Sequence, residues 1–552
     1  MCGIWACIGF SNEMLDSPNR CIKQLHERGP ESSARKDLSG CVLGFTRLAI
    51  NGLNSEGMQP MTNGRLWWIC NGEIYNWKQL SQKYGITGHS GSDCEILGTL
   101  YQKIVLEDGA EPDVFFRMLD GVYAIVIVDT ALSTVTIGRD PYGVRPMFIG
   151  TRHTILCNQL IPSSIFVASE MKAIWPLVHG VTQFMPGTCQ VINSKTLITQ
   201  YSARHHFIQY MKNPMFSPSI AGGLEMACMN LRVALESAVK KRMLTDRPVA
   251  ALLSGGVDSS LIASLVAKQL REAGAAPLKT FSIGMQGSED LKYARMVATW
   301  IGSVHHEIVV TPQVFLDSIP TVIRIIESFD TTTVRASVGN WLVAKAVAEH
   351  CDCKVVFNGD GSDEVFGSYL YFNNAPNDSS YEEEVSRLLG EIHQYDVLRS
   401  DRCISSNGLE PRTPFLDKQF VAVARSICTE WLRPVKCVRP EKWILRRAFD
   451  DGLTLPSEVL WRRKEAFSDG VSSQEKSWFE IIQDYTREAM TEGWEERAAH
   501  TFQVLTPKTP EQFFYRYHYE ANYGKSINLN HFWMPRWSPG VTDPSARALP
   551  TY

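Results

Sequence analysis

The first 200 residues carry short apolar and β-favouring runs, with turn signals between them. These runs span residues 2–10, 41–50, 66–71, 122–129, 134–140 and 188–192. Asn63-Gly64 and Pro186-Gly187 are typical turn dipeptides. The clearest helical stretch is 92–103, with Ser92 and Asp93 as N-cap candidates. Many short strands with few helices predict packed, mostly antiparallel sheets.

From about residue 224 the pattern changes to helices that alternate with strands. The predicted helices span residues 224–243, 259–273, 290–302 and 337–350, and the predicted strands span 249–253, 279–285, 306–310 and 354–357. This alternation favours a parallel, doubly wound sheet, which binds ligands at the carboxyl ends of its strands. After about residue 380 the pattern is mainly helical and ends in a polar, Pro-rich tail.

We therefore predict a two-domain α/β protein. An α+β domain of layered antiparallel sheets is expected over residues 1–202, and a linker over 203–223. A doubly wound α/β domain with extra helices is expected over 224–552. The length of 552 residues suits two to four domains at about 150 residues each.

Composition and charge narrow the class of protein. The chain is 44% hydrophobic and 21% charged, as is usual for a globular protein, and its net charge of −4 argues against the basic face of a nucleic-acid binder. The longest apolar runs, such as 121–128, are far shorter than the ~20 residues of a membrane span, and no signal peptide is expected. The 14 Cys are scattered without a CxxC pair, so we expect neither disulfides nor a Cys-rich zinc site, and a reducing, cytoplasmic compartment.

Cys2 directly follows Met1, and removal of Met1 would place a thiol and a free α-amine on one residue. The pKa of an α-amine is near 7.7–8.0, so the amine can take the proton of a nearby nucleophile. A Cys at this position is by itself more often incidental, so the motifs that accompany it decide its meaning.

Six motifs follow Cys2 in order: 47-RLAIN-51, 57-GMQP-60, 71-NGEIYN-76, Asp93, 119-LDGVYA-124 and 139-RDPYGVRP-146. Together they resemble the glutamine amidotransferase domain with an N-terminal Cys nucleophile, which implies an Ntn-hydrolase-like layered fold. The glutamine-binding residues that the resemblance implies are Arg47, Leu48, Ala49, Ile50, Asn51, Asn71, Gly72, Glu73 and Asp93.

The chemistry of these residues suits that role. Attack on a carboxamide needs an oxyanion hole, which the Asn71 side chain and the Gly72 N–H can form. The α-carboxylate of glutamine needs a guanidinium such as that of Arg47. The family places Glu73 and Asp93 at the α-ammonium group.

The chain departs from this family at 27-ERGPE-31, where the usual sequence is His-Arg-Gly-Pro-Asp. Glu27 replaces His and Glu31 replaces Asp, while the Arg28-Gly29-Pro30 turn is kept. Neither change touches the nucleophile, so we expect weaker order at the glutamine site rather than loss of chemistry.

A second constellation begins where the strand 249–253 ends in 254-SGGVDSS-260 and opens a helix. Glycines and the N–H groups of a helix start favour phosphate. Hydroxyl groups of Ser254, Ser259 and Ser260 add donors, and Asp258 can hold Mg²⁺. No GxxxxGK[ST] motif is present, which disfavours Walker-type chemistry. The loop resembles the pyrophosphate-binding loop of ATP pyrophosphatases.

More charged residues follow on neighbouring segments. Asp363, on the strand–loop–helix segment 355–372, is the expected second Mg²⁺ ligand. Arg335 in 331–337 and Lys464 in 460–470 are candidate phosphate cations.

Both halves, in order, resemble the glutamine-hydrolysing asparagine synthetase family. The resemblance also covers 396-DVLRSDR-402, 408-GLEPRTPFLD-417, 441-EKWILRRAF-449, 533-WMPRW-537 and 542-TDPSAR-547. It implies that Cys2 hydrolyses L-glutamine, and that ammonia crosses an internal passage to β-aspartyl-AMP made from L-aspartate and ATP with Mg²⁺. The implied ATP-binding residues are Leu253, Ser254, Gly255, Gly256, Asp258, Ser259, Ser260, Ile283, Asn358 and Gly359. The implied catalytic residues are Cys2, Asn71, Gly72, Asp360, Lys464 and Arg335, and a homodimer is compatible with the family.

A second departure lies at 358-NGDGSDE-364, where the family has Ser-Gly-Glu-Gly-Ser-Asp-Glu. Asp360 is shorter than Glu by about 1.5 Å, and a misplacement of ~1 Å can cost ~100-fold in rate. Two alternatives to an active synthetase stay open. One is a divergent paralogue that binds nucleotide or glutamine without net synthesis. The other is a β-lactam-forming synthetase, against which the retained Cys2, Arg47, Asn71 and Asp93 argue.

Overall fold

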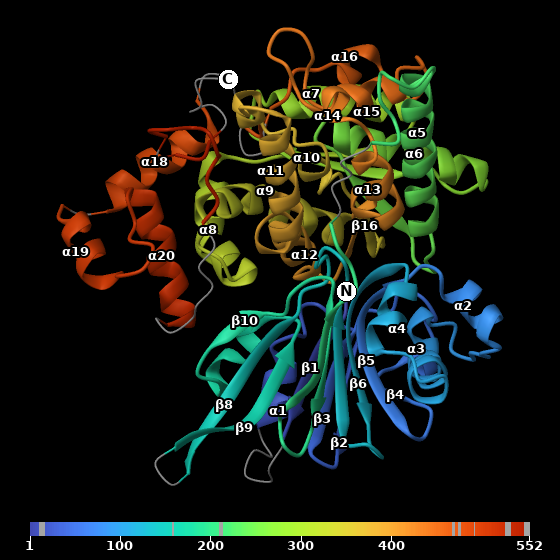
Figure 1. The fold of residues 1–552 in the computed structure, drawn as a ribbon. Coiled ribbons are helices and arrows are strands. Elements are labelled where there is room, and N and C mark those ends of the chain that lie inside the picture. Colours follow the sequence, from blue (N-terminus) through green and yellow to red (C-terminus); the bar gives the residue numbers. More distant parts are fainter. Residues whose placement is uncertain are drawn as a thin grey trace.

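The computed structural model describes residues 1–9, 17–156, 159–208, 214–465, 470–472, 476–490, 492–524, 532–541 and 543–545. Several residues of the segments quoted above lie outside these ranges: 10, 209–213 of the expected linker, 466–469, 542, 546 and 547. Figure 1 shows a lower lobe of strands, coloured blue to cyan, and an upper lobe rich in helices. The N-terminus lies at the junction of the two lobes.

The N-terminal lobe contains two six-stranded sheets in which all pairs are antiparallel, as expected. One has the order β10 (Val181–Gln183), β8 (Phe148–Leu156), β9 (Gln159–Ala168), β1 (Gly3–Ile8), β3 (Cys41–Arg47), β2 (Ser32–Leu38). The other has the order β12 (Thr199–Arg204), β11 (Thr188–Asn193), β7 (Thr134–Arg139), β6 (Gly121–Asp129), β5 (Leu66–Ile74), β4 (Met61–Thr62). Their facing side chains, such as Ile4, Phe45 and Val126, form one buried core.

Short helices flank these sheets: α1 (Ser17–Lys23), α2 (Trp77–Tyr84), α3 (Ile96–Tyr101) and α4 (Pro112–Met118). The helical stretch predicted at 92–103 begins as a 3₁₀ turn, Asp93–Glu95. The Ser92 hydroxyl accepts a hydrogen bond from the Cys94 N–H and so caps this turn, as predicted. Asp93 instead belongs to the turn itself, and its carboxylate accepts a hydrogen bond from the Ile74 N–H.

The C-terminal lobe is built on a five-stranded parallel sheet, as the alternating pattern predicts. Its order is β15 (Val304–Val309), β14 (Lys279–Gly284), β13 (Val249–Leu252), β16 (Val355–Phe357), β17 (Glu410–Arg412). The chain reverses direction across the sheet between β13 and β16, where such sheets bind ligands. Val355 and Phe357 of β16 belong to one core and Val356 to another, so both faces of the sheet are covered.

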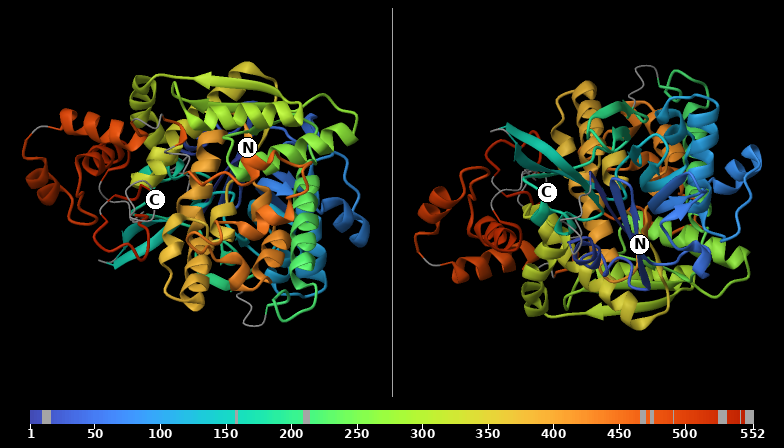
Figure 2. Two further views of the ribbon diagram at one scale, coloured as in Figure 1. Left: turned by 90° about the horizontal axis from the view of Figure 1, so that it is seen from above. Right: turned by 90° about the horizontal axis from the view of Figure 1, so that it is seen from below.

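The helices of this lobe are α5 (Gly223–Arg242), α6 (Val257–Glu272), α7 (Glu289–Ile301), α8 (Pro312–Ile326), α9 (Thr331–His350), α10 (Ser362–Val365), α11 (Asp378–Glu391), α12 (Asp396–Ser405), α13 (Lys418–Arg425), α14 (Thr429–Leu432), α15 (Trp443–Ala448), α16 (Ser457–Leu460), α18 (Trp478–Ala489), α19 (Trp494–Thr501) and α20 (Pro510–Tyr523). Both views of Figure 2 show the orange-red segment of α18–α20 on one side of the molecule. None of the described helices has the length and apolar character needed to cross a membrane.

The two lobes share their hydrophobic cores. Leu48 and Val122 of the N-terminal lobe lie in the same buried cluster as Leu231 of α5. Trp5 lies in the same cluster as Ile319 of α8. Burial of apolar surface therefore stabilises the contact between the two lobes.

Candidate active sites

Cys2 immediately precedes β1 and is half-buried. Its thiol donates a hydrogen bond to the Leu48 carbonyl at 3.6 Å. Burial raises the pKa of the Cys2 thiol to about 11 and lowers the pKa of the Met1 amine to about 6. With Met1 in place the thiol is therefore protonated, and its activation by an α-amine on Cys2 itself stays a prediction that depends on removal of Met1.

The Asn71 side chain lies on β5 and is fully buried. Neither its amide nitrogen nor its amide oxygen has a hydrogen-bond partner in the described part of the chain. A buried polar group without a partner costs about 1–3 kcal/mol, so this amide is suited to a ligand. At the next residue, Gly72, an added Cβ would clash with the carbonyl oxygen of Val122. Glycine is therefore required for sheet packing at this position.

Arg47 ends β3, and its guanidinium donates to the Asn54 carbonyl at 2.6 Å and to the Gly52 carbonyl at 2.5 Å. These bonds fix the guanidinium on the loop that follows the strand. Leu48, the residue after Arg47, accepts the hydrogen bond of the Cys2 thiol through its carbonyl, so the end of β3 lies next to Cys2.

The two predicted acids of this site, Glu73 and Asp93, are both buried. Glu73 accepts a hydrogen bond from the Asn51 amide at 2.6 Å, and Asp93 accepts one from the Ile74 N–H at 2.6 Å. Burial raises the pKa of Asp93 to about 6, and burial followed by the charge of Asp93 raises the pKa of Glu73. A bound ammonium group would lower both pKa values and would be held by both charges.

The segment 48–50 is held by the altered turn at Glu31. One Glu31 carboxylate oxygen accepts from the Ala49 N–H at 2.9 Å, and the other pairs with Arg247 of the C-terminal lobe at 2.7 Å. Arg247 also donates to the Ala49 carbonyl at 2.8 Å, and the Ile50 carbonyl accepts from the backbone N–H of Asp246. Glu31 therefore holds the segment 48–50 in place. We had expected the replacement of Asp by Glu31 to weaken the order of the glutamine site. Glu27 lies at the surface, where it pairs with Lys172 and Arg324.

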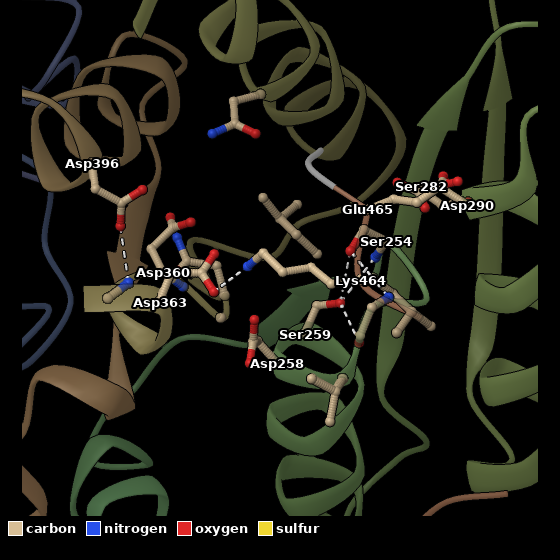
Figure 3. A pocket seen from close by; sticks show the side chains of 18 of the residues that line it. Ser254, Asp258, Ser259, Ser282, Asp290, Asp360, Asp363, Asp396, Lys464 and Glu465 are labelled. Atoms are coloured by element: carbon tan, nitrogen blue, oxygen red, sulfur yellow. Dashed lines mark hydrogen bonds and ion pairs between the residues drawn. The ribbon is translucent and has the colours of Figure 1, made fainter. Parts of the chain in front are cut away.

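A second pocket lies at the carboxyl ends of β13, β14 and β16 (Figure 3). Its lining includes most of the predicted ATP-binding residues: Leu253, Ser254, Gly256, Asp258, Ser259, Ile283, Asn358 and Gly359. The hydroxyls of Ser254 and Ser259 are 3.0 Å apart and tie the loop to the first turn of α6. Gly255 and Ser260 are not among the described lining residues. At Gly255 the backbone φ is +74° and an added Cβ would clash with Tyr293 of α7.

The carboxylates of Asp258 and Asp363 converge on one point. Both lie 2.5 Å from the ammonium of Lys442, and Lys464 also pairs with Asp363 (Figure 3). Burial acts to lower the pKa of Lys442, but the two carboxylates outweigh it and raise that pKa. Burial acts to raise the pKa of Asp363, but Lys442 and Lys464 hold it well below its usual range.

Two convergent carboxylates are a donor set that Mg²⁺ accepts together with phosphate oxygens and water. Among the described residues no group of three or more acidic, His or Cys side chains could hold a metal ion by itself. The two aspartates therefore fit a Mg²⁺ ion whose remaining ligands would be phosphate oxygens and water. Sequence reasoning assigned no role to Lys442, although its motif 441–449 was noted. The backbone φ of Lys442 is +57°, which is unusual for a residue other than glycine. This strained backbone is visible in the structure and has no signal in the sequence.

Asp360 and Asn358 are held together at the side of this pocket. The Asp360 N–H donates to the Asn358 amide oxygen at 3.4 Å, and the Asn358 amide donates to the Ser400 hydroxyl at 2.7 Å. Asp360 also pairs with Arg399 at 3.3 Å. Burial raises the pKa of Asp360 to about 6.

Arg335 lies in an environment that the sequence did not indicate. Its guanidinium is buried on α9 and pairs with Glu511 at 2.5 Å and Asp543 at 2.7 Å. It is not among the described residues that line the second pocket. Two carboxylates already neutralise the charge of Arg335, so it is not a candidate to bind phosphate. Lys442 and Lys464, which line the pocket, are the candidates for that role.

Comparison with known proteins agrees with this geometry. The family model described as "Glutamine amidotransferase domain" matches residues 1–218, and that described as "Asparagine synthase" matches residues 230–390 and 373–538. Proteins named "Asparagine synthetase [glutamine-hydrolyzing]" from Mesocricetus auratus, Mus musculus and Homo sapiens are each 40% identical over 574 residues, covering 100% of this chain and 99% of theirs. The chain therefore belongs to the family of glutamine-hydrolysing asparagine synthetases.

Proposed function

We propose that this chain makes L-asparagine from L-aspartate, ATP and ammonia released from L-glutamine. The observation that carries the proposal is the presence of two differently equipped sites in one chain, on two lobes that share their cores. One site has a thiol and a buried amide without a partner among the described residues, and the other has a glycine-rich loop and two convergent carboxylates. The full-length relatives favour this function over a paralogue without synthesis or a β-lactam-forming enzyme.

In the first site Cys2 attacks the side-chain carboxamide of glutamine once Met1 has been removed. The new α-amine takes the thiol proton and delivers it to the leaving ammonia. The Asn71 amide and the Gly72 N–H stabilise the oxyanion. Arg47 holds the α-carboxylate, and Glu73 and Asp93 hold the α-ammonium. Water then releases glutamate from the thioester.

In the second site the β-carboxylate of aspartate attacks the α-phosphate of ATP, and pyrophosphate leaves. The loop 254–260 and the cations Lys442 and Lys464 bind the pyrophosphate. Asp258 and Asp363 would hold Mg²⁺, which supplies charge neutralisation for the leaving phosphates when bound. Asp360 faces the adenylate and accepts a proton when ammonia displaces AMP.

The two sites are close enough for direct transfer of ammonia. Glu73 of the glutamine site lies 3.4 Å from the Arg412 guanidinium of β17. The Arg412 carbonyl accepts a hydrogen bond from the Asn358 N–H of the ATP pocket at 3.1 Å. One residue thus contacts both sites, which supports a passage through the lobe interface. We further propose a reducing, cytoplasmic setting, since the described cysteines are free thiols and Cys2 needs its thiol.

An end-point assay tests this function. Incubation with aspartate, ATP, Mg²⁺ and glutamine should give asparagine and pyrophosphate in equal amounts, together with glutamate and AMP. Formation of glutamate without asparagine, with ammonium salts also giving none, would support the paralogue and refute the proposal.

A further inference from the structure

Helix α12 (Asp396–Ser405) contacts the ATP pocket through three polar residues of its first two turns, Asp396, Arg399 and Ser400. Asp396 accepts from the Gly361 N–H at 2.9 Å, as Figure 3 shows. Arg399 pairs with Asp360, and the Ser400 hydroxyl accepts from the Asn358 amide at 2.7 Å. The position of the loop 358–361 therefore depends on the position of α12.

The next residue of the same helix contacts the other site. Asp401 accepts two hydrogen bonds from the Arg28 guanidinium, at 2.7 and 3.1 Å. The Nε of Arg28 donates to the carbonyl oxygen of Cys2 at 3.0 Å. Arg28 and Asp401 are 0% and 2% exposed. A buried bidentate pair of this kind has a fixed geometry, so a movement of α12 is passed on to the backbone of Cys2.

Other groups around Arg28 strengthen the link to the same helix. The Ser405 hydroxyl at the end of α12 accepts from Arg28 at 3.0 Å. Glu170 pairs with Arg28 at 2.9 Å and with Arg402 of α12 at 3.0 Å. In Figure 1 α12 lies next to the N-terminus at the junction of the lobes.

We propose that Arg28 and Asp401 are positioning residues that couple the two reactions through α12. When aspartate and ATP occupy the second site, Asp360 and Asn358 change their contacts and α12 shifts. Asp401 and Arg28 then move the Cys2 backbone, and glutamine is hydrolysed faster. This inference rests on the proposed function, and it assigns to the 28-RGP-30 turn a role that is separate from binding glutamine.

The test compares the parent with Asp401→Asn and with Asp120→Asn. Asp120 pairs with Lys241 of the other lobe at 2.7 Å, so the control removes a charge from a different pair between the lobes. Glutamate and asparagine are both measured, with and without aspartate and Mg²⁺-ATP. Thermal unfolding of all three proteins reports on folding.

In the parent and in Asp120→Asn, aspartate and ATP should raise kcat/KM for glutamine hydrolysis at least about 5-fold, the lower end of usual coupling. In Asp401→Asn this activation should fall below about 2-fold. Synthesis from ammonium should stay within about 2-fold of the parent. Arg28→Lys, which keeps the charge but loses the bidentate pair, should show the same uncoupling if Asp401→Asn does not fold.

Activation that persists in both Asp401→Asn and Arg28→Lys would overturn the inference. Equal loss in Asp120→Asn would also overturn it, because any weakened lobe contact would then suffice. A parent that forms no asparagine from either nitrogen source would instead refute the proposed function. Activation of glutamate release would still be measurable in that case.

Discussion

Asp360 and Asn358 differ from the family pattern, and the structure places them in contact through the Asp360 N–H and the Asn358 amide oxygen. Asp360 pairs with Arg399, and Asn358 donates to Ser400, so α12 holds both residues. The shorter carboxylate thus has a partner that fits it. We interpret the two changes as one compensated pair rather than as a weakened site.

This interpretation predicts the behaviour of three variants. Asp360→Glu alone should lower the rate of asparagine synthesis about 10- to 100-fold, since the longer side chain is misplaced by more than 1 Å. Asn358→Ser with Asp360→Glu should recover most of the loss, because residues in contact have non-additive effects. The measurement is synthesis from ammonium, with glutamine hydrolysis as an internal control. An increase on Asp360→Glu alone would show that the parent site is impaired.

At the scale of elements, the loop 254–260 and the 441–443 segment build the proposed phosphate site from parts that are far apart in sequence. Lys442 lies at the N-terminus of α15, and its ammonium is shared by Asp258 of α6 and Asp363 of α10. Without Lys442 the carboxylates of Asp258 and Asp363 would repel each other, and Lys464, which pairs with Asp363, would be the cation left beside them.

Replacing this lysine gives a second prediction. Lys442→Met should lower pyrophosphate release about 100-fold, the size of effect seen when one stabilising donor is lost. It should destabilise the ligand-free protein by about 3–5 kcal/mol, as expected when a buried ion pair loses one partner. Mg²⁺ with ATP should raise its melting temperature more than that of the parent, because a cation then replaces the ammonium.

The matched control is Lys268→Met on α6, where the lysine is exposed and pairs with Glu236 at 3.3 Å. A Lys442→Met protein with the pyrophosphate release of this control would remove Lys442 from the site.

Six of the strands that the sequence predicts lie in the N-terminal lobe and contain buried residues. The runs at 2–10, 41–50, 66–71, 122–129, 134–140 and 188–192 correspond to β1, β3, β5, β6, β7 and β11. Strand β2 was missed because its sequence, SSARKDL, lies at a sheet edge with every residue partly or fully exposed. Helix α8 was missed despite its buried apolar face, since Pro320 lies inside it. Local pattern therefore missed the exposed edge strand β2, the short buried strand β17 and a helix that contains proline.

At the scale of the whole molecule, the sites were predictable where a motif itself forms the geometry. The segment 254-SGGVDSS-260 joins a strand to a helix, so its role follows from local sequence. The contacts of Arg335 do not, because Glu511 and Asp543 follow it by 176 and 208 positions. Arg28 and Asp401 are 373 positions apart, so their pairing also needed the folded chain.

The central claim is that two lobes with separate sites carry out one synthesis, in which Cys2 releases the nitrogen from glutamine. The thiol lies before β1, and the phosphate loop lies between β13 and α6, so the loss of one site leaves the other intact. Variants of Cys2 therefore test the claim most directly, with Cys437→Ala at an exposed cysteine as the control.

The decisive measurement is asparagine formed by Cys2→Ala from glutamine and, separately, from ammonium chloride. We predict at least a 100-fold loss with glutamine, the least expected when a catalytic nucleophile is removed, and a rate within about 3-fold of the parent with ammonium. The Cys437→Ala control should match the parent with both nitrogen sources. Glutamine-dependent synthesis that survives in Cys2→Ala would contradict the account.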